Sequence, residues 1–348
     1  MNFGESRLWS KRHLLQAISA AGIGAALGTS PKPARSQTTS KLIVGSLAFP
    51  NWCQLAAAQN FGWDKAEGVD GKFDVKYFES GPPEIEAGIG GSLQLMGLGA
   101  GPVINALAAG ALPLWILGSV NEVTPLFGIV AQKGIESMQG LRGKKIAVTL
   151  GTNYQYFLEA ALADSGMTTK EVTLIDSQPN EGTISFVAGR VDATVPDYTD
   201  IKLLPRRVPG ATVLLSGSDI GKDGGSTFRI FDLWVAPAKN FDANRATIKG
   251  IMEATARWAD FVGNPATHAD AINFAVDWGS KISGKALVRA DIEATMEGAH
   301  FFNAAGQKEL LESGTLAQAL KNHTEFLYRL RLLQRVPDFE ASIAKSFW

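Results

Sequence analysis

The chain has 348 residues, and its 33 Lys and Arg residues nearly balance its 34 Asp and Glu residues. Residues 1–36 hold five of the basic residues and one of the acidic residues, so the remaining 312 residues carry a formal net charge of −5. This mild acidity, without a basic patch, argues against binding to nucleic acid or to anionic membrane surfaces. The remaining length suffices for one large or two ordinary domains.

The first 36 residues have the pattern of an export signal. The paired cations Lys11 and Arg12 precede a weakly apolar run at 14–27, and residues 34–36 are suited to a signal peptidase. The run is shorter than the roughly 18 apolar residues that a membrane-spanning helix needs. We therefore predict a signal peptide at 1–36. The twin-arginine and general secretory routes both stay open, because Lys11 stands where the first arginine of a twin-arginine signal is usual.

The single cysteine, Cys53, lies well inside the predicted mature chain. A bacterial lipoprotein needs a cysteine directly after its cleavage site, so we expect no lipid. One cysteine also cannot form an internal disulfide. We expect Cys53 to be a small buried apolar residue. The sequence thus predicts an exported, soluble, non-lipidated protein of the periplasm.

Beyond residue 40, strand-like and helix-like segments alternate, which indicates an α/β fold. Apolar or alternating runs predict strands at 41–45, 73–78, 93–98, 114–117, 127–130, 145–148, 172–175, 193–195, 212–215 and 233–236. Ala-rich or amphipathic runs predict helices at 53–61, 102–109, 153–165, 181–188, 245–262, 269–277, 286–296 and 316–336, and Pro82 and Pro83 open a further helix.

Two strand–loop–helix junctions, at 97–102 and 148–154, carry the functional prediction. At each, the first N–H groups of a helix lack an intrahelical partner and lie at the positive end of the helix dipole, which suits an anion. Thr152 and Asn153 add side-chain donors at the second junction. Each junction can also be an ordinary helix cap. A dinucleotide site at the first junction is disfavoured, because it follows the third predicted strand and Pro102 replaces the last glycine.

The sequence contains no catalytic constellation. Beyond residue 36 the histidines are His268, His300 and His323, all in the C-terminal helical region and without metal-ligand spacing. No G-x-S-x-G nucleophile motif is present. We therefore expect a binding protein rather than an enzyme, with no cofactor and no metal.

Six segments form an ordered pattern: YFESG at 77–81, the small-residue loop at 97–102, LRGKKIAV at 141–148, GTNY at 151–154, GRVDA at 189–193 and FDLWV at 231–235. Together they resemble the periplasmic solute-binding proteins of ABC importers, in the taurine, sulfonate and nitrate group that shares its fold with the thiamin-pyrimidine precursor synthases. The resemblance extends from about residue 41 to the C-terminal helices.

The resemblance implies an α/β fold of the two-lobed periplasmic binding protein type (type II-like), with the ligand in the cleft between the lobes. We expect the first lobe at 41–125 plus 245–348 and the second lobe at 126–244. It also implies a monomer that delivers a small organic anion to an ABC permease and its ATPase in the inner membrane. A binding protein that serves a sensor would have the same sequence features.

The resemblance also implies a set of ligand contacts. An anionic head group would lie on the loop N–H groups and on Thr152 and Asn153, and aromatic side chains would wall the rest of the ligand. Asp232 matches a position that can pair with a ligand amine, or it can be a structural carboxylate. The candidate ligand-binding residues are Asn51, Trp52, Gly99, Ala100, Gly101, Thr152, Asn153, Tyr154, Tyr198, Asp232 and Trp234.

The ligand itself is predicted only by class. Taurine-type proteins usually have serines where this chain has Gly99, Ala100 and Gly101. Strand alternation puts Asp232 and Trp234 on one face, a pairing that suits a cationic amine. We therefore expect taurine or a related sulfonate, and more generally a zwitterionic or hydrogen-bond-donating organic anion. Nitrate, an aromatic carboxylate and a thiamin-pyrimidine precursor are the alternatives. An enzyme of the precursor-synthase type is a further alternative, which is disfavoured because those relatives depend on His and Cys residues that this chain does not supply near its predicted cleft.

If residues 1–36 are a cleaved signal, the exported protein should begin near Gln37 and carry no lipid. N-terminal sequencing of protein from the periplasmic fraction tests this, with the cytoplasmic precursor as the comparison. Finding an intact Met1 or a lipid-modified cysteine on the exported protein would contradict the prediction.

Overall fold

The computed structural model describes residues 41–221, 228–239 and 241–348. The predicted signal peptide at 1–36 therefore lies outside the described residues. Within the described ranges, no helix combines the length and the apolar character needed to pass through a bilayer.

The described residues form two mixed five-stranded sheets, of which the first has the order β2-β1-β3-β10-β4. β1 pairs in parallel with β2 on one side and β3 on the other, and β10 runs antiparallel between β3 and β4. Both β3 and β10 are buried along their whole length, which accounts for their mostly apolar sequences. The strands are β1 (Leu42–Leu47), β2 (Phe73–Phe78), β3 (Leu95–Gly99), β4 (Leu114–Glu122) and β10 (Phe231–Pro237).

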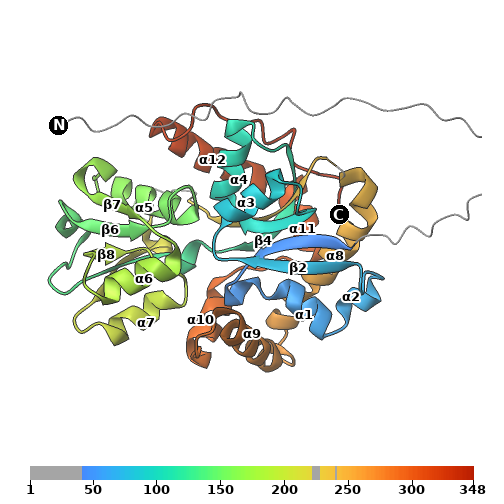
Figure 1. Ribbon diagram of the computed structural model, residues 1–348, viewed down its shortest axis with the longest axis horizontal. Coiled ribbons are helices and arrows are strands. Elements are labelled where there is room, and N and C mark those ends of the chain that lie inside the picture. Colours follow the sequence, from blue (N-terminus) through green and yellow to red (C-terminus); the bar gives the residue numbers. More distant parts are fainter. Residues whose placement is uncertain (1–40, 222–227, 240) are drawn as a thin grey trace, which may run out of the picture. The chain divides into compact units, whose positions relative to one another are not determined.

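The second sheet has the order β7-β6-β8-β5-β9. In Figure 1 the labels of β6, β7 and β8 lie among those of its three helices, on the other side of the picture from β2 and β4. Its strands are β5 (Gly128–Ala131), β6 (Lys145–Val148), β7 (Thr173–Asp176), β8 (Ala193–Thr194) and β9 (Thr212–Ser216), and its helices are α5 (Asn153–Asp164), α6 (Pro179–Val187) and α7 (Asp200–Arg207).

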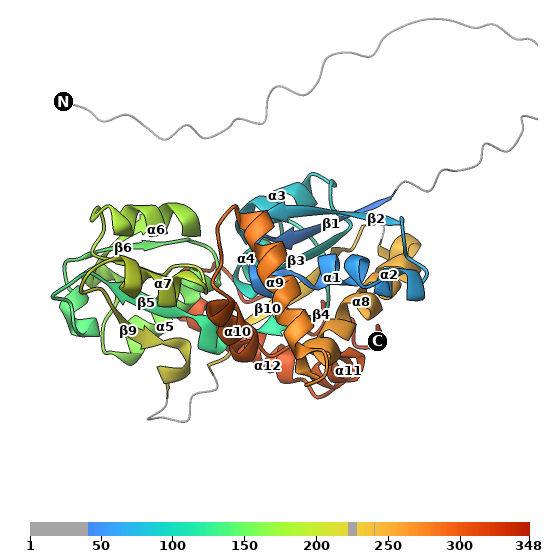
Figure 2. The ribbon, with the colours of Figure 1, turned by 90° about the horizontal axis from the view of Figure 1, so that it is seen from below.

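The C-terminal helices return to the first sheet. α8 packs on α1 and α2, α9 and α10 contact the 3-10 helix η1 (Pro50–Trp52), and α11 contacts β4. Figure 2 shows α8 and α9 beside α1 on one side of this sheet. The remaining helices are α1 (Gln54–Asn60), α2 (Trp63–Ala66), α3 (Gly81–Ile89), α4 (Ala100–Ala109), α8 (Phe241–Gly263), α9 (His268–Ser283), α10 (Arg289–Gly298), α11 (Ala304–Glu312) and α12 (Thr315–Arg329).

The chain crosses between the sheets twice. It leaves β4 for β5 through the 3-10 helix η2 (Thr124–Leu126), and it returns from β9 to β10. The predicted second lobe, 126–244, includes the residues of β10, but this strand pairs with β3 and β4 of the first sheet. Local patterning predicts a strand correctly here and does not reveal its partners, because strand pairing depends on residues far away in the sequence.

Most predicted strands and helices are present within a few residues of their predicted bounds. The helix predicted at 316–336 is shorter: α12 ends at Arg329, and Arg331 has a left-handed φ of 62° that a continuing helix cannot accept. The sequence analysis did not predict α7, which has Pro205 inside it and buries only Asp200 and Leu204. A proline inside a segment is a helix-breaking signal, which explains why the sequence pattern did not indicate a helix here.

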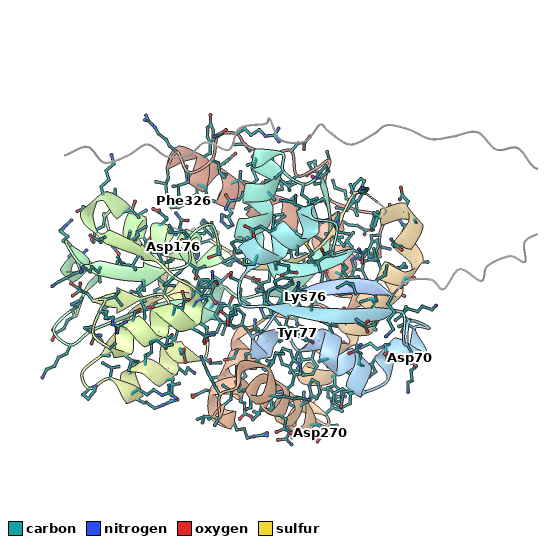
Figure 3. All side chains as sticks on the ribbon, viewed as in Figure 1. Asp70, Lys76, Tyr77, Asp176, Asp270 and Phe326 are labelled. Atoms are coloured by element: carbon teal, nitrogen blue, oxygen red, sulfur yellow. The ribbon has the colours of Figure 1, made fainter. Side chains whose placement is uncertain are left out.

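An aromatic stack joins α12 to α5. The ring of His323 lies on the ring of Tyr156, with the centroids 3.4 Å apart, and Phe326, which Figure 3 labels on α12, meets the same tyrosine at 5.6 Å. His323 is 1% exposed. Burial lowers the pKa of His323 from 6.5 to about 3, because a charged imidazolium has no water around it. The imidazole is therefore neutral in the folded protein at neutral pH.

His323 should make the protein less stable in mild acid. The unfolded chain protonates this histidine near pH 6.5 and the folded protein only near pH 3, so stability falls as the pH drops below 6.5. The expected loss is about 2 kcal/mol at pH 5. The fall in melting temperature between pH 7 and pH 5 should therefore be smaller in His323→Gln than in the wild type.

A matched control is His300→Gln, because His300 is exposed. This variant should keep the wild-type difference between the two pH values. An equal fall in the wild type and in His323→Gln would contradict the prediction.

Candidate functional site

The strand order creates a topological switch point in the first sheet. The chain continues from β1 to β2 on one side of β1, and β3 is added on the other side. Ligands of open α/β sheets bind beyond the carboxyl ends of the strands at such a point. The ends of β3 and β4, the residues after β1 and the start of the antiparallel β10 all lie at this edge.

The first turns of α4 and α5 meet at this edge. The backbone N–H of Gly101 in α4 donates to Oδ1 of Asn153 in α5 at 2.9 Å, and Nδ2 of Asn105 donates to the carbonyl of Gly151 at 3.0 Å. A Cβ on Gly101 would lie 2.6 Å from the backbone carbon of Thr152. Glycine at this position therefore permits the two helix starts to approach each other.

The side chain of Asn153 uses both ends of its amide. While Oδ1 accepts from Gly101, Nδ2 donates to Oδ1 of Asp232 at 3.0 Å and to the carbonyl of Phe231 at 3.2 Å. Asn153 is 4% exposed. The amide of Asn153, in α5 of the second sheet, is thus bonded to β10 of the first sheet and to α4, the helix that follows β3 of that sheet.

Thr152 is the N-cap of α5. Its hydroxyl accepts from the backbone N–H of Tyr154 at 3.2 Å and donates to the carbonyl of Thr149 at 2.6 Å. The sequence analysis expected Thr152 and Asn153 to bind an anionic head group, with ordinary capping as the alternative. In the structure both side chains make hydrogen bonds inside the protein, which corresponds to the capping alternative for Thr152.

Four buried side chains next to this contact have polar atoms without a hydrogen-bond partner among the described residues. The atoms are both side-chain polar atoms of Asn51, Oδ1 of Asn121, the hydroxyl of Tyr154 and Oδ2 of Asp232. We call these four residues the polar cluster. A buried polar group without a partner is costly and rare, so a group of them marks a place where a ligand or water completes the hydrogen bonds.

The members of the polar cluster are neighbours. Nδ2 of Asn121 donates to the carbonyl of Asn51 at 3.0 Å, and Asn121 faces Asp232 across the β4–β10 pair. The ring of Tyr154 stacks on Tyr198, with centroids 6.1 Å apart and an interplanar angle of 26°. Further unpaired buried polar atoms lie in the last residues of β1 or just after β2 and β7, on Ser46, Ser80, Ser177, Gln178 and Asn180.

Carboxylates dominate the electrostatics of the polar cluster. Burial raises the pKa of Asp232 well above its ordinary value, and the hydrogen bond from Asn153 offsets only part of this rise. Burial also raises the pKa of the Tyr154 hydroxyl, and the negative charges of Asp197 and Asp232 raise it further. Both phenols near these acids, Tyr154 and Tyr198, therefore stay protonated and can donate hydrogen bonds.

Lys285 pairs with two acidic residues that follow β8 of the second sheet. Its ammonium lies 3.6 Å from Oδ2 of Asp197 and 3.4 Å from Oδ2 of Asp200. Lys285 and Asp197 border a cavity of about 280 Å³. Its wall comes from β2 and the residues after β1, from α6 and the residues after β8, and from the end of α9 and the α9–α10 connection. The lining residues are Ala48, Phe49, Pro50, Tyr77, Phe78, Glu79, Asn180, Asp197, Thr199, Ile282, Ser283, Lys285 and Leu287.

The cavity adjoins the polar cluster through two aromatic contacts. Phe49, in the cavity wall, meets Tyr198 with ring centroids 6.2 Å apart, and Tyr198 stacks on Tyr154. Tyr77, which Figure 3 labels on β2, meets Trp278 of α9 at 5.5 Å on the other wall. A small organic molecule could therefore lie between the cavity and the polar cluster, against aromatic rings and buried carboxylates.

The other residues predicted to bind the ligand are packed in the apolar cores or against Asn153. Trp234 is 3% exposed and covers Gly97, where an added Cβ would lie 2.7 Å from the indole. Trp52 is 1% exposed and belongs to the same apolar core as Trp234, although its Nε1 lacks a partner among the described residues. Ala100 is buried in the larger apolar core, and Gly99 packs on the amide of Asn153.

The sequence analysis missed Asn121, Asp197, Lys285 and a buried acid, Glu84 of α3. Glu84 is 0% exposed and lies against Gly45 of β1, where an added Cβ would clash with its carboxyl group. Burial raises the pKa of Glu84 well above its usual range, and the nearby backbone of Gly97 offsets only part of this. A neutral carboxylic acid thus lies between β1 and β3 at the switch point.

Comparison with known proteins identifies the family. The sequence profile of the NMT1/THI5-like family matches residues 50–268, more than half of the chain. The chain belongs to the NMT1/THI5-like family. This agrees with the resemblance seen in the sequence.

Relatives of this NMT1/THI5-like chain are named as binding proteins. A Bacillus subtilis protein, provisionally named an aliphatic sulfonates-binding protein, is 35% identical over 169 residues, which cover 47% of this chain and 50% of the relative. The taurine-binding periplasmic protein of Escherichia coli is 26% identical over 162 residues, covering 47% and 48%. A provisionally named binding protein of Brucella abortus is 32% identical over 161 residues, covering 46% and 48%. The chain thus spans about half the length of these relatives.

Solved structures share the fold. The alkanesulfonate-binding protein SsuA of Xanthomonas axonopodis pv. citri, bound to MOPS, has a TM-score of 0.71 at 22% identity, covering 87% of this chain and 98% of that one. The periplasmic nitrate-binding protein NrtA of Synechocystis has a TM-score of 0.70 at 13% identity, covering 89% and 87%. The α/β fold of periplasmic binding proteins predicted from the sequence is therefore confirmed.

In this NMT1/THI5-like chain, the buried Glu84 should affect how the stability of the protein depends on pH. Because the pKa of Glu84 is raised on folding, its contribution is fully present below the unfolded value of about 4.5 and is lost as the pH rises. Glu84→Gln keeps the shape and removes the ionisation. The variant should melt at a higher temperature than the wild type at pH 8, with a smaller difference at pH 5.

Glu86→Gln is the matched control, because Glu86 lies on the same helix and is exposed. It should leave the pH dependence unchanged. If Glu84→Gln is less stable than the wild type at pH 8, then Glu84 is ionised in the folded protein and the prediction is contradicted.

Proposed function

We propose that this NMT1/THI5-like chain is the exported substrate-binding component of an ABC importer, which captures a small organic molecule in the periplasm and delivers it to a permease and its ATPase. The fold and the names of the relatives as binding proteins support this role. In this proposal the two sheets are the cores of two lobes, and the second lobe ends before β10. The protein acts as a monomer and not as an enzyme.

One observation carries the proposed ligand site. The polar cluster brings together unpaired buried atoms from the residues after β1, from β4, from β10 and from α5. Three of these elements belong with the first sheet and one with the second, so a ligand that satisfies these atoms would contact both. A binding protein that holds its ligand between two lobes requires such a site.

The chemistry of the polar cluster favours a ligand that donates hydrogen bonds. Oδ2 of Asp232 and the side-chain oxygens of Asn51 and Asn121 are acceptors without a partner among the described residues. A buried carboxylate suits a protonated amine, which would also neutralise its charge. We therefore propose a ligand with a cationic amine or another N–H group directed at Asp232.

Taurine and related amino-sulfonates satisfy this requirement. Neutral donors are available for a sulfonate group, namely Nδ2 of Asn51, the hydroxyl of Tyr154 and the hydroxyl of Ser46. Inorganic nitrate or sulfate has no N–H group from which Asp232 could accept a hydrogen bond. Amino-sulfonates are thus our first candidates, and other small organic amines with a polar group are the second.

A thermal-shift screen of small organic molecules tests the proposal, because a ligand that binds only the folded state raises the melting temperature. The panel contains taurine, other amino-sulfonates, amines, amine-free sulfonates, nitrate and sulfate. Amine-bearing compounds should give the largest shifts with the wild type. A larger shift from nitrate or sulfate than from any organic amine would reject the proposed ligand class.

Asp232→Asn should weaken the binding of the amine-bearing ligands by about 10- to 100-fold, the equivalent of a charge-assisted hydrogen bond of about 1.5–3 kcal/mol. Calorimetry gives the dissociation constants. The control is Asp74→Asn, which changes an exposed aspartate on β2 that pairs with Lys41. It should bind as the wild type does, and unchanged binding by Asp232→Asn would make Asp232 a structural residue.

A further inference from the structure

We propose that Asn153 is an internal substitute for an anionic head group: its amide oxygen occupies the donor at the start of α4, so the protein selects against simple organic anions. This inference rests on the proposed function and deepens it, because it states which ligands the site rejects. It makes Asn153 a specificity-determining residue rather than a ligand contact.

The first support is the hydrogen bond at the start of α4. This helix has ten residues, and its first N–H groups lie at the positive end of the helix dipole, where an anion would bind. In the structure the N–H of Gly101 is bonded to Oδ1 of Asn153 at 2.9 Å, and the backbone of Thr152 covers Gly101 so closely that a Cβ would not fit. An external sulfonate oxygen would have to displace the asparagine to reach this donor.

The second support is the carboxyl group of Asp232. It holds the other end of the same amide through Nδ2 of Asn153, and its own Oδ2 is buried without a partner among the described residues. Asp232 is 2% exposed. An anion that displaced Asn153 would therefore leave the buried carboxyl group of Asp232 without its hydrogen-bond donor, and a sulfonate has no hydrogen to replace that donor.

The direction of the amide is fixed by its partners. Oδ1 faces a backbone donor, and Nδ2 faces two acceptors, the Phe231 carbonyl and Asp232. Reversing the amide would place oxygen against oxygen and nitrogen against N–H. The asparagine thus presents the start of α4 with an acceptor and Asp232 with a donor, which are the two groups that an amino-sulfonate would offer.

The consequence is that Asp232 recognises the amine of a ligand, while Asn153 keeps a sulfonate from the helix donor. An amine can still reach Oδ2 of Asp232, because Asn153 uses only Oδ1. An amine-free alkanesulfonate finds the helix donor filled and a carboxyl group beside it. We therefore expect the wild type to bind ethanesulfonate weakly, whatever its affinity for amine-bearing ligands.

The test uses ethanesulfonate as the probe and calorimetry as the measurement. Asn153→Ala frees the Gly101 donor, and combining it with Asp232→Asn also removes the carboxylate. The double variant should bind ethanesulfonate at least about tenfold more tightly than the wild type, the effect of one charge-assisted hydrogen bond. The single variant Asn153→Ala should gain less, because it leaves the buried carboxyl group of Asp232 without a donor and the probe offers none.

Asn105→Ala is the matched control. It removes the other hydrogen bond between the helix starts, from Nδ2 of Asn105 to Gly151, but leaves the Gly101 donor occupied. It should not gain affinity for ethanesulfonate. An equal gain in Asn105→Ala would show that loosening the contact between the helices is enough, and would overturn the role given to Asn153.

Circular dichroism and melting curves establish that each variant is folded. Should the alanine variant not fold, Asn153→Ser with Asp232→Asn keeps a small polar side chain and carries the same expectation. Two results overturn the inference: tight binding of ethanesulfonate by the wild type that Asn153→Ala weakens, or no gain in a folded double variant. The proposed function is tested with amine-bearing ligands on the wild type, so the two can fail separately.

Discussion

The amide of Asn153 is the interaction on which the arrangement of the candidate site depends. It connects the first helix of the second sheet with the start of α4 and with the strand that returns to the first sheet. Its oxygen and nitrogen are used in opposite senses, so neither an aspartate nor an apolar residue could replace it without leaving a buried group unpaired. The polar cluster lies beside this bridge, and the approach of the two helix starts allows Tyr154 and Asp232 to come near each other.

The site is acidic and rich in acceptors, whereas the relatives with the most informative names bind sulfonates. The two observations agree if the ligand carries both signs of charge. Burial favours the neutral forms of Asp232 and Glu84, so a cation that entered could exchange its charge for a proton on Asp232. In the proposed function, the capture of a cationic amine at Asp232 would therefore release a proton.

Local sequence features predicted much of the fold and less of the site. Apolar runs and helix caps lie in neighbouring residues, so β6, α5 and the helix after Pro82 could be read directly from the sequence. The polar cluster depends on contacts between residues far apart in the chain, such as Asn51 with Asn121 and Asn121 with Asp232. Asn153 illustrates the difference: residue type and spacing indicated a donor at a helix start, but only the packing of α4 and β10 against it showed what its amide bonds.

The C-terminal segment determines when the first sheet can be completed. Residues of this segment flank β4, with the N–H of Ile116 bonded to the carbonyl of Ser342 and the indole N–H of Trp348 bonded to the carbonyl of Leu117. They cover a strand that would otherwise be the open edge of its sheet. The second sheet is made from one continuous stretch of chain and has shorter loops to close. The second sheet can therefore form without the C-terminal segment, while β4 keeps an unprotected edge until residues 342–348 pack on it.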